Sequence, residues 1–471
     1  MDTKPITQLQ QFREELYQFF TARPDALLDL LDALSSSPDA RSVVELSLSP
    51  LFRRGYSSIG DAIEHLFQPT HPETADAERQ TWRKELARLI GHHLPPPAPR
   101  KFWLLGTDVV PVPRPFAATL ADRSYVHQPN LVAGNKPVTI GHQYSLVGYL
   151  PPKTHPSAPP WVVPLHVRRV PSAEKPTLVG AAQLVALVED PAQPFHANLC
   201  VHVADSAYSA VKYVAQVAPL PHLVNVIRTA ENRVFYRQYS AQQTGGGSGH
   251  PHWYGEPFDL KVPTTWGTPA VTAETSFTTK HGRRYRVQLQ GWHNLLRHSK
   301  RGLPMHCYPF TLIRAVVLDE QGQPVFQRAL WLMVVGERRS ELSLVEAWEA
   351  YRQRYDLEHY FRFGKQRLLL ATYQTPEVEH EENWLVVTQL ATVQLWLARE
   401  LAGAQLRPWE RYLPLRVGAV ASPSQVQRDW ERIIHQIGTP ARAPKRRGNS
   451  KGRAKGVQPA PRPRQPVVRK T

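Results

Sequence analysis

The chain is 471 residues long, with 42% hydrophobic and 9% aromatic residues, which is enough for two or three globular domains with their own cores. Its net charge of +17 at pH 7 favours a polyanionic partner such as nucleic acid. Two cysteines, Cys200 and Cys307, are too few for a disulfide framework or a cysteine-based zinc site, and their apolar contexts predict reduced, buried thiols.

No segment has the pattern of a secretion signal or a membrane span. The first ten residues, MDTKPITQLQ, contain no apolar signal segment. The most apolar later stretch, from Trp384 to Ala402, is interrupted by polar residues and a glutamate, so it predicts a buried helix. We therefore expect a cytoplasmic protein without a membrane partner.

Residues 1–92 have the periodicity of several short helices, among them LQQFREELYQFF and DALLDLLDAL. They predict a compact helical domain and a candidate DNA-binding domain, in which the pair Arg53 and Arg54 can contact phosphate. A plain helical bundle explains the same residues. The segment at 93–100, within HHLPPPAPR, predicts a stiff Pro-rich linker.

The region 101–230 alternates strand and helix patterns and predicts the first part of an α/β core. The run FWLLGTDVV is a short apolar strand that ends at Asp108, and NLCVHVADSAYS is a buried strand that ends at Asp205. Two acids therefore emerge from strand ends, at the edge where α/β folds usually build their sites. Each acid alone also fits a structural role, Asp108 in a turn and Asp205 as a helix N-cap.

The remaining chain falls into three parts. Residues 231–336 contain a Gly-rich turn, TGGGSG, and Thr/Tyr/Trp-rich runs that predict a β-rich insertion. Residues 337–438 return to helix patterns and predict the second part of the core. Residues 439–471 hold eleven Lys or Arg and no acid, without apolar periodicity, and predict a disordered basic tail.

The segment YRQRYDLEHYFRFGK, at residues 351–365, surrounds one carboxylate with two cations and a phenol. On a helix with about 100° per residue, four side chains fall within a stripe about 60° wide: Tyr351, Arg354, Glu358 and Lys365. A metal-binding acid with phosphate-binding neighbours has this pattern. A solvated helix face with one i,i+4 pair, Arg354 with Glu358, is the structural alternative.

Asp108, Asp205 and Glu358, called the acid triad below, suit phosphoryl transfer on nucleic acid. Such reactions use paired divalent cations about 4 Å apart, which stabilise the attacking and leaving oxygens. Hard cations such as Mg²⁺ prefer carboxylate oxygens and keep water positions open. The acid triad is therefore a candidate metal-binding set.

The spacing Tyr-x2-Arg-x3-Glu-x6-Lys resembles the signature of bacterial insertion-sequence DDE transposases, the cut-and-paste group with a β-rich insertion before the catalytic Glu. The strand ending in Asp108, the ADSAYS motif around Asp205 and the insertion extend the resemblance over residues 10–435. It implies a ribonuclease H-like fold, a mixed sheet with flanking helices. It also implies a bacterial protein associated with the nucleoid.

The resemblance assigns roles to individual residues. It implies that the acid triad is catalytic and holds two Mg²⁺ ions, with Mn²⁺ as an alternative. It also implies that Tyr351, Arg354 and Lys365 hold phosphates of the DNA end, Arg354 by a two-pronged contact and Lys365 as a point charge. Val109 stands where many relatives have threonine, which leaves Asp122 as the alternative first acid.

Relatives also have a tryptophan at a strand end of the insertion that stacks on a base flipped out of the duplex. Trp331, in RALWLMVV, fits that context, and Trp266 and Trp292 are weaker candidates. A core tryptophan in a hairpin is the alternative for Trp331.

Twenty histidines include two close pairs, His92-His93 and His250-Pro251-His252. Neither pair has the i,i+4 helix spacing of a zinc protease or a nearby set of cysteines. We therefore expect structural or solvent-facing histidines.

The resemblance implies a DNA transposase that cuts and joins the ends of its own insertion sequence, by hydrolysis followed by strand transfer. Its partners would be double-stranded DNA, at element ends and target, and a second protomer, since joining two ends requires two sites. No small-molecule cofactor is expected. Two alternatives stay open: a catalytically inactive, transposase-derived DNA-binding protein, and a ribonuclease H-like nuclease without strand transfer.

Overall fold

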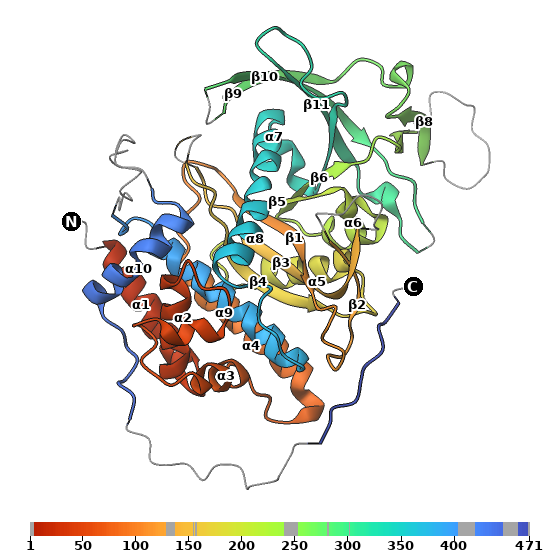
Figure 1. The fold of residues 1–471 in the computed structure, drawn as a ribbon. Helices are drawn as coiled ribbons and strands as arrows, with labels where there is room; N and C mark the ends of the chain where they lie inside the picture. The colour runs from red at the N-terminus through yellow and green to blue at the C-terminus, as the bar shows by residue number, and fades with distance from the viewer. Residues whose placement is uncertain are drawn as a thin grey trace.

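A ten-stranded mixed sheet with helices on both faces organises the computed structural model (Figure 1). The structure describes residues 4–128, 137–153, 155, 158–239, 253–279, 282–300, 302–403, 420–445 and 460–469. The strand order is β2-β3-β1-β5-β6-β12-β11-β10-β9, with β4 paired to β3, and β7 and β8 form a separate pair. The strands are β1 (Trp103–Pro113), β2 (Ser124–His127), β3 (Val138–Tyr149), β4 (Val163–Val170), β5 (Cys200–Ala204), β6 (Leu223–Thr229), β7 (Val234–Gln238), β8 (Tyr254–Asp259), β9 (Val271–Thr278), β10 (Arg284–Leu295), β11 (Phe310–Leu318) and β12 (Leu330–Val335).

Five strands, in the order β4-β3-β1-β5-β6, form the centre of the sheet. β3 is antiparallel to β1 and β4, whereas β1, β5 and β6 run parallel. The parallel strands are almost continuously apolar and buried, as expected for strands covered on both faces. This mixed α/β arrangement is compatible with the ribonuclease H-like fold that the resemblance implies.

Strands of the region 231–336 extend the same sheet. β12 pairs antiparallel with β6, so β11, β10 and β9 continue outward from the central strands. In Figure 1 these strands lie at the top of the molecule, beyond α7. The Gly-rich turn at 244–249 lies outside the described residues.

Ten α-helices are described: α1 (Lys4–Phe19), α2 (Pro24–Ser36), α3 (Ser57–Glu64), α4 (Ala75–His92), α5 (Pro176–Val188), α6 (Val211–Val217), α7 (Leu344–Gln353), α8 (Tyr355–Arg367), α9 (Val378–Leu397) and α10 (Pro423–Ile437). The apolar stretch predicted as a buried helix is α9, in which residues 383–397 are all buried. None of the described helices has the length and apolar character needed to cross a membrane.

The amino-terminal helices pack against α9, which lies between them and β4 (Figure 1). Arg13 of α1 forms a buried two-pronged ion pair with Asp32 of α2, at 2.6 and 2.8 Å, and also donates to Gln394 of α9 at 3.0 Å. Residues of these helices, the sheet and the late helices form one continuous hydrophobic cluster.

The guanidinium groups of Arg53 and Arg54, candidate phosphate contacts, are paired with groups of the protein itself. Both guanidinium groups form ion pairs with Asp29, at 2.6 Å from Arg53 and 3.0 Å from Arg54. They also donate to the carbonyls of Ala441 and Arg442. This pair therefore links α2 to the segment after α10.

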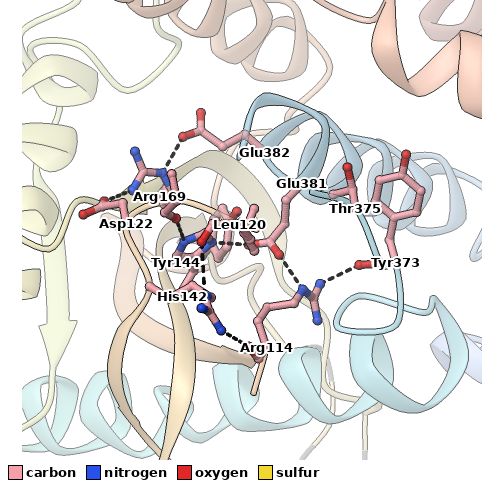
Figure 2. A network of polar contacts seen from close by, with 12 residues as sticks. Arg114, Leu120, Asp122, His142, Tyr144, Arg169, Tyr373, Thr375, Glu381 and Glu382 are labelled. Atoms are coloured by element: carbon pink, nitrogen blue, oxygen red, sulfur yellow. Dashed lines mark hydrogen bonds and ion pairs between the residues drawn. The ribbon is translucent and has the colours of Figure 1, made fainter. Parts of the chain in front are cut away.

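A buried polar network fixes the start of α9 against β1 and β3 (Figure 2). Glu381 accepts hydrogen bonds from Arg114 Nε at 2.6 Å and from the Tyr144 hydroxyl at 2.7 Å. His142 Nδ1 lies 2.7 Å from the same carboxylate. Arg114 and Glu381 are fully buried, so each depends on the other for charge compensation.

The alternative first acid, Asp122, belongs to this same region and not to the acid triad. It pairs with Arg169, which also donates to Glu382 at 2.9 Å, and it accepts from the Ser172 amide at 3.1 Å (Figure 2). Asp122 therefore has a structural ion pair, and the first acid of the candidate site is Asp108.

One sequence prediction is wrong, because Cys307 is exposed, whereas Cys200 is buried as expected. In the tail, 439–471, Gln465 and Val468 donate backbone hydrogen bonds to the carbonyls of Ala118 and Arg123. Val468 also forms a bridge with Ser124 of β2. Residues 446–459 lie outside the described residues.

Candidate active site

Consecutive residues of β1 show which face of the sheet carries Asp108. A Cβ atom on Gly106 would lie 3.0 Å from Leu357 of α8, whereas one on Gly180 of α5 would lie 3.0 Å from the side chain of Thr107. Side chains alternate along a strand, so Gly106 faces α8 and Thr107 faces α5. Asp108 therefore returns to the face that α8 covers.

Asp205 reaches the same face from the neighbouring strand. β1 and β5 are parallel, with Gly106 opposite Val203, so Asp108 and Asp205 each lie two residues further on. Strands in a sheet are about 5 Å apart, which places the two acids at adjacent positions. β5 ends at Ala204, and Asp205 caps the next turn by accepting from the Ala207 amide at 2.9 Å.

The sequence predicted a strand that ends at Asp108, but β1 does not end there. It continues to Pro113 because β3 pairs with it along the other edge, from Leu105 to Pro113. The parallel pairing with β5 stops at Gly106. Asp108 thus lies just beyond the last pair of residues that joins β1 to β5.

The third acid, Glu358, lies in the first turn of α8. The positive end of the helix dipole favours a carboxylate there. A single helix was expected across residues 351–365, but α7 ends at Gln353 and α8 begins at Tyr355, with Arg354 between them. The Arg354 guanidinium donates to Glu358 at 3.1 Å and to Asp108 at 3.4 Å.

The acid triad is electrostatically coupled. Burial raises the pKa of Asp108 to about 6, and repulsion from Asp205 and Glu358 adds to this effect, while the Val109 amide and Arg354 oppose it. The side chains of Asp108 and Glu358 remain 22% and 42% exposed, so the cluster opens to solvent. The three carboxylates at this solvent-accessible edge are therefore a candidate site for cations.

Tyr351 and Lys365 complete the signature, on α7 and α8. Tyr351 is buried, and the Arg354 guanidinium lies 5.8 Å from the centre of its ring. Burial raises the pKa of the Tyr351 hydroxyl. Lys365 lies on α8 and is half-buried, and burial lowers the pKa of its ammonium group.

Trp331 lies in β12 within a group of aromatic rings and is only 3% exposed. Its ring centroid is 5.1 Å from that of Trp266 and 5.9 Å from that of Trp292. Trp292 is also buried, and Trp266 is partly buried, with its indole N–H donating to the Asp259 carbonyl at 2.8 Å. The three rings therefore pack on one another in this conformation.

The chemistry of the acid triad fits divalent ions, because all three ligands offer carboxylate oxygens. Among the described residues, the three ligand atoms that lie within 4.8 Å of one another belong to a different group, Glu15 with His92 and His93. In the acid triad, the Arg354 guanidinium contacts both Asp108 and Glu358. Two ions about 4 Å apart can be bound by different members of the triad, so the three acids need not all coordinate one ion.

Sequence reasoning missed two sets of residues near the triad. Arg362 is exposed on α8, and at about 100° per residue it falls on the same face as Glu358, so the helix arithmetic could have found it. Beneath the triad, His202 Nε2 lies 2.8 Å from the Thr107 hydroxyl and His202 Nδ1 lies 3.0 Å from the Asn225 side-chain oxygen. These two contacts join β5 to β1 and β6, and no local pattern in the sequence indicates them.

One comparison relates the chain to a known family. A family model described as DDE superfamily endonuclease matches residues 15–297. The match includes Asp108 and Asp205 and stops before Glu358. The search of curated proteins gives no match.

Proposed function

Because the chain belongs to the DDE superfamily of endonucleases, we propose that it is a DNA transposase that cuts and joins the ends of its own insertion sequence. The substrate is double-stranded DNA, and the reaction is metal-dependent phosphoryl transfer, hydrolysis followed by strand transfer. The site of action is the bacterial nucleoid. Two protomers act together, since two element ends must be joined.

The observation that carries this proposal is the meeting of three distant acids around Arg354. Asp108 and Glu358 share its guanidinium, and Asp205 lies beside Asp108 on the next strand. Two divalent ions, Mg²⁺ or Mn²⁺, held by these carboxylates would activate the attacking oxygen and stabilise the leaving oxygen. This set of acids accounts for both hydrolysis and strand transfer, because both are displacements at phosphorus.

The cationic side chains position the substrate. Arg354 can exchange its contacts with Asp108 and Glu358 for a two-pronged contact with a phosphate. Lys365 supplies a point charge on α8. The Tyr351 ring lies 5.8 Å from the Arg354 guanidinium and helps to hold it in place. Trp331 is buried in this conformation. For it to stack on a flipped base, its aromatic neighbours would have to move.

A basic surface adjoins the triad and provides a path for a DNA strand. One hollow beside Asp205 is lined by Ser206, Arg228, Lys261 and Arg328, among other residues. A second hollow shares Arg228 and Arg328 and adds the exposed ring of Phe326. Arg228, Lys261 and Arg328 are all exposed, and Arg328 pairs with Glu231 of the same hollow at 3.4 Å. Arg228 and Lys261 can neutralise phosphates beyond the cleaved bond.

The decisive test replaces Glu358 by glutamine, which keeps the size of the side chain and removes its charge. The substrate is a plasmid that carries the inverted repeats flanking the coding region, incubated with Mg²⁺. We expect end binding to persist and cleavage to fall by about 1000-fold or more, the loss of several kcal/mol of transition-state stabilisation. Glu349→Gln, at an exposed position of α7, is the matched control and should cleave normally.

The products separate the alternatives. Joined DNA molecules support the transposase, whereas nicks and breaks without joining identify a nuclease that uses the same acids. Binding without cleavage by the unaltered protein, in either Mg²⁺ or Mn²⁺, identifies an inactive DNA-binding relative. Normal cleavage by the Glu358→Gln variant would refute the assignment of the third acid.

A further inference from the structure

A second cluster of ligand atoms, separate from the acid triad, lies where α1 meets the end of α4. Among the described residues, Glu15, His92 and His93 have three candidate ligand atoms within 4.8 Å of one another. Both histidines approach the same carboxylate oxygen, Glu15 Oε2. His93 Nε2 lies 2.8 Å from it and His92 Nδ1 lies 3.6 Å from it.

These distances fit a tetrahedral ion. Zinc binds imidazole nitrogen and carboxylate oxygen at about 2.0–2.1 Å, so ligand atoms in a tetrahedral site are about 3.3 Å apart. The two observed distances bracket that value. Small rotations of the His92 and Glu15 side chains would equalise them.

Neighbouring side chains prepare the three groups. Gln11, one turn earlier on α1, donates to Glu15 Oε1 at 2.8 Å and leaves Oε2 directed at the histidines. Phe12 packs its ring edge-on against His93, with centroids 5.3 Å apart, and Gln8 donates to the His93 carbonyl at 2.9 Å. Supporting contacts of this kind orient the ligands of natural metal sites.

We propose that Glu15, His92 and His93 bind one divalent transition-metal ion of the zinc class, with water in the fourth position. Nitrogen ligands distinguish this site from the all-oxygen acid triad, which suits Mg²⁺. His92 is 67% exposed, so the ion can enter from solvent. The ion would connect α1 to the end of α4 and stabilise the amino-terminal helices.

The test measures Zn²⁺ and Co²⁺ binding to the full chain in which Asp108→Asn, Asp205→Asn and Glu358→Gln remove the other site. Calorimetry gives the Zn²⁺ affinity, and the visible absorption of Co²⁺ reports tetrahedral coordination. We expect one Zn²⁺ site whose affinity falls at least tenfold in His92→Ala, and a melting temperature that rises by about 3 °C at a hundredfold excess over Kd. His435→Ala, at an exposed position of α10, should change neither quantity.

His92→Ala alters an exposed side chain and should leave the fold intact, and Glu15→Gln provides a second variant that keeps the size of the ligand. The proposal is overturned if the parent binds no Zn²⁺ at about 100 µM, or if His92→Ala and Glu15→Gln both bind it as tightly as the parent. Because the acid triad is absent from every sample, this result is independent of the transposase proposal.

Discussion

Thr107 and Asp108 are neighbours in β1 that face opposite sides of the sheet. Contacts that hold the Thr107 side chain in place therefore also affect the position of Asp108. Thr107 is fully buried, and its hydroxyl lies 2.8 Å from His202, which also contacts Asn225 and, at 3.2 Å, Tyr213. Burial lowers the pKa of His202 to about 3, so the ring is neutral at pH 7. This neutral ring joins β1, β5 and β6 directly beneath the acid triad.

Replacing His202 by leucine should leave the Thr107 hydroxyl and the Asn225 side-chain oxygen without this partner, at about 1–3 kcal/mol for each buried group. Urea unfolding would measure the loss of stability. If His202 positions Asp108, kcat should fall while the Kd for DNA stays within about twofold, with partial recovery in His202→Gln. Equal activity of His202→Leu and the exposed-site control His196→Leu would contradict this role.

At the residue scale, the candidate acids could be chosen from the sequence, but the groups that hold them could not. Asp205 follows a strand and Glu358 lies on a helix face, as local periodicity indicated, whereas Asp108 lies within β1 and not at its end. His202 and Asn225 occupy apolar strands and are linked only by the register between strands. Glu15 and His92 were not associated because nothing local connects α1 with the end of α4.

At the scale of elements, the distance between α8 and β1 decides whether Glu358 reaches the other acids. Gly106 permits that approach: a Cβ there would lie 3.0 Å from Leu357 and 3.1 Å from Leu150. Leu357 precedes Glu358 on α8, so any displacement of one moves the other. Close packing of α8 on β1 therefore needs a residue without a side chain at position 106, and so does the approach of Glu358 to Asp108.

Gly106→Val should push α8 away from β1, which we expect to destabilise the protein by about 1–3 kcal/mol and to reduce cleavage. Urea unfolding and the plasmid assay would measure the two effects. Gly60→Ala is the matched control, since nothing lies within 4 Å of its added Cβ and α3 should gain about 0.5–1 kcal/mol. Unchanged stability and cleavage in Gly106→Val would show that α8 does not depend on this contact.

Element boundaries were harder to predict than element types. The strand through Asp108 was expected to stop there, because the sequence cannot show that β3 pairs with β1 as far as Pro113. The helix arithmetic assumed one straight helix across 351–365 and therefore missed the break at Arg354. Both differences come from tertiary contacts, which local patterns do not contain.

For the whole molecule, buried histidines make folding stability depend on pH. Burial lowers the pKa of His166, in β4, to about 3, well below its ordinary value of 6.5. Between these values the unfolded chain binds a proton that the folded chain does not. Stability is therefore fully present above about pH 6.5 and is lost as the pH falls toward 3, by up to about 1.4 kcal/mol per pH unit for this group.

Denaturant unfolding of the unaltered protein and of His166→Gln, measured between pH 7 and pH 4, would check this effect. The variant lacks the titrating group. Its free energy of unfolding should therefore fall less steeply with decreasing pH, by up to about 1.4 kcal/mol per pH unit. Gln183 lies 2.7 Å from His166 Nδ1 and can contact the introduced amide. Parallel curves for the two proteins would show that His166 does not contribute.

The last described residues change how the sheet ends. β2 is an outer strand, and such strands present unpaired amide and carbonyl groups to which another chain can add. Val468 bridges Ser124, the first residue of β2, and donates to the carbonyl of Arg123 just before it. The segment at 460–469 thus covers the start of this outer strand, where another chain could otherwise add.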